Sequence, residues 1–275
     1  MIELAISSWT VHGALGAPWY EPDAGGLMMN KAEPQPAALT LLELPAFVAA
    51  EGFKLLEICN FHLPSIADEY LADLRRALEG SGVTLVNLLI DTGNLSSADE
   101  AAWRGDIEAA KGWQDIAVKL GAQGVRLDCG TEAPSPEAIE RSVKALRELI
   151  DYGASIGLSA TTENWRQTSV ESENLLSIMQ SVDRPLQLCV DFGNAAKTSD
   201  KYATMRALLP QATSLHCKGN FTGDTLDVAE FQRSLSLVRE ANFAGHVALI
   251  YDGTDKEWDK VLTLKAHVER ELLLA

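Results

Sequence analysis

Three side chains of the kinds that bind divalent metal ions stand at the ends of three consecutive apolar segments. Glu163 ends LSATTE, Asp191 ends LQLCVD, and His216 lies within SLHCKG. If these segments are neighbouring parallel strands, their carboxyl ends meet at one rim. Two carboxylates and one imidazole form a donor set suited to Mn²⁺, Mg²⁺, Co²⁺ or Zn²⁺. The pattern therefore indicates a candidate metal site made by Glu163, Asp191 and His216.

Each of these residues also has a structural interpretation when taken alone. Asp191, in VDFGN, is typical of an aspartate that caps a turn or helix after a strand. His216 stands between two apolar residues and is typical of a hydrogen-bonded core histidine. Glu163 is harder to explain as packing, because a carboxylate that faces a barrel interior needs a partner. The three together favour a site over three separate structural roles.

The elements that must position these residues repeat eight times along the chain. Short apolar runs of strand type alternate with longer stretches of helical period, as in repeated βαβ units. The runs are IELAISSW from Ile2, KLLEICNF from Lys54, TLVNLLID from Thr84, GVRLDCG from Gly124, LSATTEN from Leu158, LQLCVDFG from Leu186, SLHCKG from Ser214 and HVALIYDG from His246. Eight units favour a closed (β/α)8 TIM barrel, with an open doubly wound sheet as the alternative.

The stretches between the strands carry helix signals. Ser135 with Pro136 predicts a cap and first turn, Asp227 predicts another cap, and the last helix is expected from about Thr254. Residues 11–38, rich in Gly and Pro, interrupt the regular pattern after the first strand. A stretch of this length is typical of a lid or binding loop, and a surface excursion without function is the alternative.

Length, composition and charge limit the classes of function. A chain of 275 residues, 47% hydrophobic, suits one barrel domain over residues 1–275. The formal charge of −16 opposes a nucleic-acid partner. No apolar run reaches the roughly 20 residues of a membrane span, and Glu3 stands where a signal peptide would be basic, which together predict a cytoplasmic protein. The cysteines form no CxxC pair and are expected as reduced core thiols: Cys59, Cys129, Cys189 and Cys217.

Four motifs in order, TTENW, CVDFGNA, SLHCKG and ALIYDG, resemble the xylose-isomerase-like superfamily of sugar isomerases and epimerases (sugar phosphate isomerase/epimerase family). The resemblance covers essentially the whole chain. By position it implies that Glu163, Asp191 and His216 bind a divalent metal. It further implies that Asn194 and Lys218 face the substrate. DNA repair endonucleases share this fold, but the five histidines and the acidic charge of this chain do not suit them.

The eighth strand departs from that resemblance. Relatives commonly read IEYEG there, and its first glutamate is a fourth ligand and a second acid or base. Aligning the shared Tyr and Gly places Ile250 at that position. Asp252 lies on the same face but one pleat, about 6.6 Å, further on. It would serve as a ligand only in a different register, and a DG turn is the alternative. Metal binding therefore stays open from the sequence.

The resemblance implies a reaction that moves a proton beside a carbonyl of a neutral sugar or polyol, with Glu163 as base. Without a second carboxylate, one-face isomerisation or elimination is easier than epimerisation. The alternative is a carbohydrate-binding barrel that has lost its fourth ligand and its catalysis. Relatives also imply a homodimer. Further expected substrate contacts at the mouth are Trp9, His12, His62, Arg126 and Asp252, beside the wider candidates Glu57, Asn60, Asp91, Asp128 and Trp165.

Overall fold

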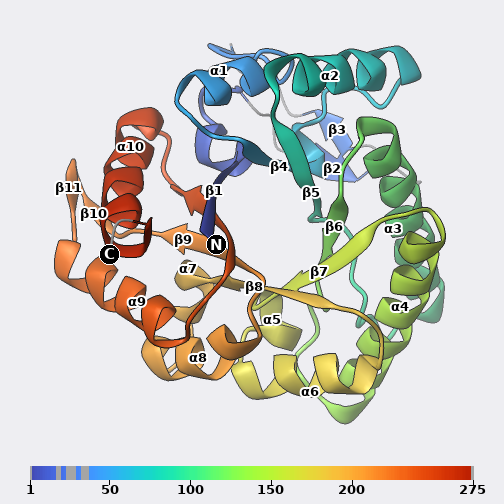
Figure 1. The fold of residues 1–275 in the computed structure, drawn as a ribbon. Helices are drawn as coiled ribbons and strands as arrows, with labels where there is room; N and C mark the ends of the chain where they lie inside the picture. Colours follow the sequence, from blue (N-terminus) through green and yellow to red (C-terminus); the bar gives the residue numbers. More distant parts are fainter. Residues whose placement is uncertain (1, 17–19, 23–28, 32–36, 274–275) are drawn as a thin grey trace.

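The computed structural model describes residues 2–16, 20–22, 29–31 and 37–273. Eight parallel strands close into a barrel in the order β1-β12-β9-β8-β7-β6-β5-β4, and helices surround it (Figure 1). The sequence prediction of a (β/α)8 TIM barrel is confirmed. The strands coincide with the eight predicted segments: β1 Ile2–Ser7, β4 Leu55–Cys59, β5 Thr84–Ile90, β6 Gly124–Leu127, β7 Ser159–Glu163, β8 Gln187–Asp191, β9 Ser214–Lys218 and β12 Gly245–Ile250.

The outer layer consists of amphipathic helices that each bury one apolar stripe against the strands. They are α1 Leu44–Ala50, α2 Asp68–Ser81, α3 Glu100–Leu120, α4 Pro136–Ser155, α6 Ser172–Val182, α8 Lys201–Leu208, α9 Val228–Glu240 and α10 Glu257–Val268. The one-turn helices α5 Arg166–Ser169 and α7 Phe192–Ala195 follow β7 and β8 closely. Among the described residues, none of these helices has the length and apolarity to cross a membrane.

Two hairpins add to the barrel. One pairs β2 Tyr20–Pro22 with β3 Met29–Lys31, within the segment predicted as a lid. Residues 17–19, 23–28 and 32–36 of that segment lie outside the described residues, so its lid role stays a prediction, as does the single-domain boundary. The other hairpin pairs β10 Phe221–Thr222 with β11 Thr225–Leu226 and follows β9 at the mouth of the barrel.

Side-chain caps fix where the predicted helices start. The Ser135 hydroxyl accepts a hydrogen bond from the Ala138 amide at 3.1 Å, and the Asp227 carboxylate accepts one from the Glu230 amide at 3.1 Å. Such caps satisfy amides that have no partner within the helix. The last helix begins at Glu257 rather than near Thr254, because Lys256 has a left-handed φ of 48° that precedes helical geometry.

The core has an outer and an inner part, because side chains alternate along each strand. Outward residues such as Leu56, Ile58 and Leu188 pack against the helices in one large cluster. A small inner cluster of Ala5, Ala248 and Ile250 fills the barrel between β1 and β12. The four cysteines are buried and free, as predicted. The polar interior therefore lies away from this cluster, among strands β4 to β9.

Candidate functional site

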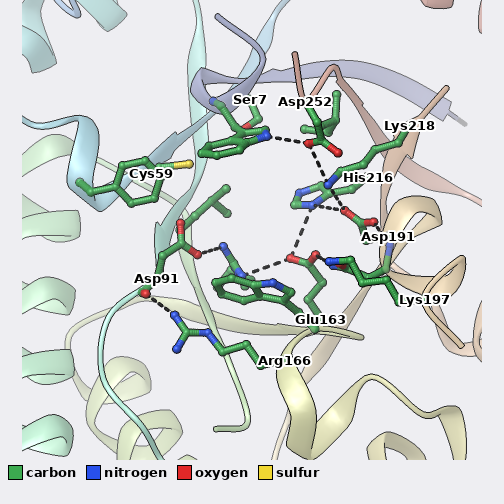
Figure 2. A pocket seen from close by; sticks show the side chains of 17 residues that line it. Ser7, Cys59, Asp91, Glu163, Arg166, Asp191, Lys197, His216, Lys218 and Asp252 are labelled. Carbon is green, nitrogen blue, oxygen red and sulfur yellow. Dashed lines mark hydrogen bonds and ion pairs between the residues drawn. The ribbon is translucent and has the colours of Figure 1, made fainter. Parts of the chain in front are cut away.

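The carboxyl ends of the barrel strands surround a cavity of about 430 Å³. That volume is typical of small-molecule sites. Figure 2 shows charged side chains from β7, β8 and β9 pointing into it, with aromatic rings along its sides. Eight of the ten sequence-predicted site residues line this cavity: Trp9, Arg126, Glu163, Asp191, Asn194, His216, Lys218 and Asp252.

The three predicted metal ligands meet at its centre. The Nδ1 atom of His216 lies 3.5 Å from Oε2 of Glu163 and 3.5 Å from Oδ2 of Asp191. All three side chains are buried, at 3% exposure for Glu163, 1% for Asp191 and 5% for His216. They meet because β7, β8 and β9 are neighbours in the barrel and Asp191 stands opposite His216 in the strand register. The structure thus brings the three together at one rim.

The two separations from His216 suit a divalent cation. Ligand atoms bound at about 2.1 Å in tetrahedral geometry lie about 3.4 Å from one another, close to the two 3.5 Å separations from His216 Nδ1. Among the described residues, the group whose ligand atoms all lie within 4.8 Å of one another is Glu163, Cys189 and His216. This group contains the Cys189 sulfur and does not include Asp191. These oxygen, nitrogen and sulfur donors are chemically suited to a metal ion. The kinds of donor atom do not determine which ion.

The second ring nitrogen of His216, Nε2, contacts Glu57. The sequence indicated Glu57 only as one of several candidates at the mouth of the barrel. His216 Nε2 donates to Glu57 Oε2 at 2.8 Å, and the side-chain amide of Asn87 donates to Glu57 Oε1 at 3.2 Å. Metal-binding histidines commonly donate their second N–H to a carboxylate in this way. The signal in the sequence was the inward-facing period of LLEIC, in which Glu57 and Cys59 share a face.

Charge stabilises this pair. Burial would raise the pKa of Glu57, but the neighbouring His216 and His246 hold it well below its ordinary range. Burial would likewise lower the pKa of His216, yet Cys189, Glu163 and Glu57 raise it well above its ordinary value. The Glu57–His216 contact is therefore a charge-assisted hydrogen bond in a buried setting, the stronger kind of hydrogen bond in proteins.

Asp191 carries both interpretations that the sequence left open. Its Oδ1 accepts a hydrogen bond from the Asn194 amide at 2.6 Å and so caps α7, while its Oδ2 faces His216. The Asn194 side chain in turn donates to Oε1 of Glu163 at 2.8 Å. The tight turn after β8 therefore orients both carboxylates, and capping and site membership are compatible in one residue.

Lys218 joins the centre of the cavity to its rim. Its Nζ lies 3.2 Å from Oδ2 of Asp191 and 3.1 Å from Oδ1 of Asp252. Trp9 Nε1 donates to the same Asp252 oxygen at 2.7 Å. Burial would raise the pKa of Asp191, but Lys218 and His216 lower it. Asp252 is 57% exposed, which places this carboxylate at the mouth rather than among the buried donors.

The last strand supplies no carboxylate to the interior. Ala248 stands opposite His216 and Ile250 stands opposite Lys218 in the β12–β9 register. Ile250 lines the cavity, β12 ends there, and Asp252 follows beyond the strand. The position that the resemblance assigned to a fourth ligand is thus occupied by an aliphatic side chain.

An aromatic and cationic wall closes the opposite side. The Trp165 ring has the Arg126 guanidinium 4.7 Å from its centroid and the Arg166 guanidinium at 4.3 Å. Arg126 pairs with Asp91, and Nη1 of Arg126 lies 3.2 Å from Oε2 of Glu163. Arg166 pairs with Asp128 at 3.1 Å, and burial raises the pKa of Asp128 to about 6. These pairs hold the wall in place and bring a positive charge next to Glu163.

Two predicted substrate contacts do not line the cavity. Nδ1 of His62 lies 2.7 Å from the Ser8 hydroxyl, and the side chain is buried. Nδ1 of His12 lies 2.6 Å from the Trp9 carbonyl oxygen, and its ring stacks on Trp9. His62 ends the 3-10 turn that follows β4, and His12 comes directly after the 3-10 turn that follows β1. There the two-residue alternation of a strand no longer predicts direction.

A family described as the xylose isomerase-like TIM barrel matches residues 45–263. The chain therefore belongs to the xylose isomerase-like TIM barrel family. A search of curated proteins gave no match.

Several solved structures share the fold of this chain. D-allulose 3-epimerase from Methylomonas sp. has a TM-score of 0.70 and 17% identity over 98% of each chain. A xylose isomerase-like protein from Mycobacterium smegmatis, in complex with magnesium, has a TM-score of 0.68 and 15% identity over 98% of this chain and 96% of that one. A probable 3-DHS dehydratase from Bacillus anthracis has a TM-score of 0.71 and 12% identity over 98% and 99%. At these identities the likeness shows the fold.

Proposed function

We propose that this protein is a carbohydrate isomerase that moves a proton beside the carbonyl group of a sugar or polyol. In this proposal Glu163, Asp191 and His216 hold a divalent metal ion, and Glu163 is the base. The observation that carries it is the convergence of the three buried donors, with both carboxylates 3.5 Å from one imidazole nitrogen. The sugar epimerase and the magnesium complex among similar structures support the same class.

A divalent cation in this donor set would polarise the substrate carbonyl and stabilise negative charge on its oxygen. The residues of the chain perform the remaining tasks. Asn194 fixes one oxygen of Glu163 by its 2.8 Å hydrogen bond, so the carboxylate takes the proton from carbon in one orientation and returns it to the neighbouring carbon, while the hydroxyl proton passes from one substrate oxygen to the other. Trp9 and Trp165 line the cavity and offer apolar faces to a sugar ring while they exclude water.

The residues at the end of β12 bear on whether a base is present on one face of the substrate or on both. Epimerisation at one carbon needs a base on each face of the substrate, and Ile250 occupies the place of the second one. A process on one face, either aldose–ketose isomerisation or elimination, needs only Glu163. The probable 3-DHS dehydratase among the similar structures would be an example of elimination on this fold. We favour isomerisation, and the product distinguishes the two.

A carbohydrate-binding barrel without catalysis is the second candidate. Ile250 favours this candidate, because it leaves the site without a fourth ligand. The side-chain ion pairs favour it too, because Lys218 lies 3.2 Å from Asp191 and Arg126 lies 3.2 Å from Glu163, where each compensates the charge of a carboxylate. In that case the cavity would bind a sugar with no need of a metal. Thermal stabilisation by sugar that persists in a chelator would support this candidate.

Deuterium exchange tests the proposal. Ketoses and aldoses, D-fructose among them, are incubated in D2O with the protein and Mn²⁺ and followed by NMR. We expect interconversion of a ketose and its aldose with the wild type, with deuterium in the product wherever the proton on Glu163 exchanges with solvent. Both signals should be lost in Glu163→Gln and retained in the exposed control Glu140→Gln. Absence of both interconversion and exchange for every sugar contradicts the proposal. An epimer at the exchanged carbon contradicts the one-face process.

A further inference from the structure

A second cavity of about 500 Å³ adjoins the candidate site. The two cavities share Lys218, Ile250 and Asp252 in their linings. The ion pair between Lys218 and Asp252, at 3.1 Å, therefore stands at their boundary. Figure 2 shows both of these side chains at the edge of the first cavity. A ligand longer than the first cavity would have to pass this pair to reach the second.

The wall of the second cavity is held by a buried lysine. Lys260 is 3% exposed, and its Nζ donates to the Gly223 carbonyl at 2.6 Å and lies 3.3 Å from Asp255. The same ammonium lies 4.9 Å from the ring centroid of Phe221 and 5.0 Å from that of Tyr251. These contacts tie the β10–β11 hairpin to the loop after β12. The wall is therefore ordered before any ligand arrives, which lowers the entropic cost of binding.

The chemistry of this wall suits a neutral sugar ring. Phe221 and Tyr251 meet edge to face with centroids 5.5 Å apart, and Phe221 is half-buried at the cavity surface. Aromatic faces pack on the apolar C–H side of sugars, while carboxylates accept hydrogen bonds from hydroxyls and side-chain amides both donate and accept them. Asn220, Asp252 and Asp255 supply those groups, and the two carboxylates are 57% and 65% exposed. Asp252 pairs with Lys218 and Asp255 with Lys260, so the lysines of this wall already have carboxylate partners that a phosphate would have to displace.

We infer that the substrate is a disaccharide or glycoside that spans both cavities. Its reacting sugar occupies the first cavity, and a second, uncharged sugar ring packs on Phe221 in the second. This inference rests on the proposed function, because it assigns the reacting ring to the cavity of Glu163. It excludes a sugar phosphate as the preferred substrate and gives the second cavity the role of selecting for substrate length.

Calorimetric titrations in Mn²⁺ with matched probes test the inference. The probes are D-fructose, fructose 6-phosphate, and the ketose disaccharides isomaltulose, turanose and lactulose. We expect the best disaccharide to bind about tenfold more tightly than fructose, and fructose 6-phosphate to bind more weakly than fructose. Phe221→Ala lowers the ratio of disaccharide to fructose affinity about five- to tenfold. Phe221→Tyr keeps the ring and the ratio.

Phe61→Ala is the matched control, because Phe61 lines only the first of the two cavities. This variant weakens both sugars alike and leaves the affinity ratio unchanged. Equal affinities for fructose and all three disaccharides, or a ratio that Phe221→Ala does not lower, overturn the inference and leave the proposed function standing. Failure of every sugar to bind contradicts the proposed function itself.

Discussion

Replacement of Glu57 by glutamine tests how the site holds its histidine. Glu57 is 1% exposed and accepts a 2.8 Å hydrogen bond from Nε2 of His216. In Glu57→Gln the side chain keeps its size and loses its negative charge. The His216 ring then has a neutral partner behind it, so its Nδ1 becomes a weaker ligand and its orientation is less fixed. We expect the fold to persist and metal affinity to fall.

The magnitude follows from the kind of contact. Removal of an outer carboxylate partner of a metal-binding histidine lowers metal affinity about 10- to 100-fold, or about 1.4 to 2.7 kcal/mol. We expect the fall in metal affinity of Glu57→Gln to lie within this range, because Glu57 also accepts a hydrogen bond from Asn87 at 3.2 Å and is enclosed by protein. An exposed carboxylate in the same position would matter less, since water would replace it.

The assay is calorimetric titration of the purified protein with Mn²⁺ and Co²⁺. Glu257→Gln is the control, because Glu257 is also a buried carboxylate, 7% exposed, that accepts from two backbone amides at 2.6 and 2.9 Å. Both variants are expected to lose thermal stability, and only Glu57→Gln is expected to lose metal affinity. Equal metal affinity in Glu57→Gln and the wild type would refute the positioning role of Glu57.

Further predictions concern pH, packing and the missing ligand. Burial lowers the pKa of His62 from 6.5 to about 3, so the unfolded chain binds this proton first and stability falls as the pH drops below 6.5. At pH 5 the free energy of unfolding is therefore lower by about 2 kcal/mol. In urea titrations the difference in the free energy of unfolding between pH 8 and pH 5 should be smaller by this amount in His62→Gln than in the wild type. Phe231 is fully buried on α9, so Phe231→Ala should lower the free energy of unfolding by about 3 to 5 kcal/mol in urea titrations. Ile250→Glu, which returns a carboxylate to the cavity, should raise Mn²⁺ affinity at least about tenfold by calorimetry; an unchanged affinity would show that Ile250 does not stand in a ligand position.

Much of the architecture was predictable because it follows local periodicity. Apolar runs of strand length and capped helical stretches recur eight times, and only a closed parallel barrel accommodates that order readily. The same regularity placed Glu163, Asp191 and His216 at strand ends on one rim. Their meeting needed only that β7, β8 and β9 be neighbours, which the βαβ connection ensures.

The rest depended on contacts between distant parts of the chain. Glu57 and His216 are separated by 159 positions, and they meet across the barrel interior rather than between neighbouring strands. His62 was predicted to reach the site from a loop, but its Nδ1 lies 2.7 Å from the Ser8 hydroxyl, a contact between distant positions that the sequence does not indicate. The second cavity depends on the β10–β11 hairpin, whose two-residue strands are too short to produce a sequence pattern.

Anomalous diffraction from crystals grown with Mn²⁺ would test the central claim most directly. The account predicts a strong anomalous peak bounded by Glu163 Oε2, Asp191 Oδ2 and His216 Nδ1, and loss of that peak in Glu163→Ala. Saturating Mn²⁺ without a peak among these three atoms, or with its only peak elsewhere on the molecule, would contradict it.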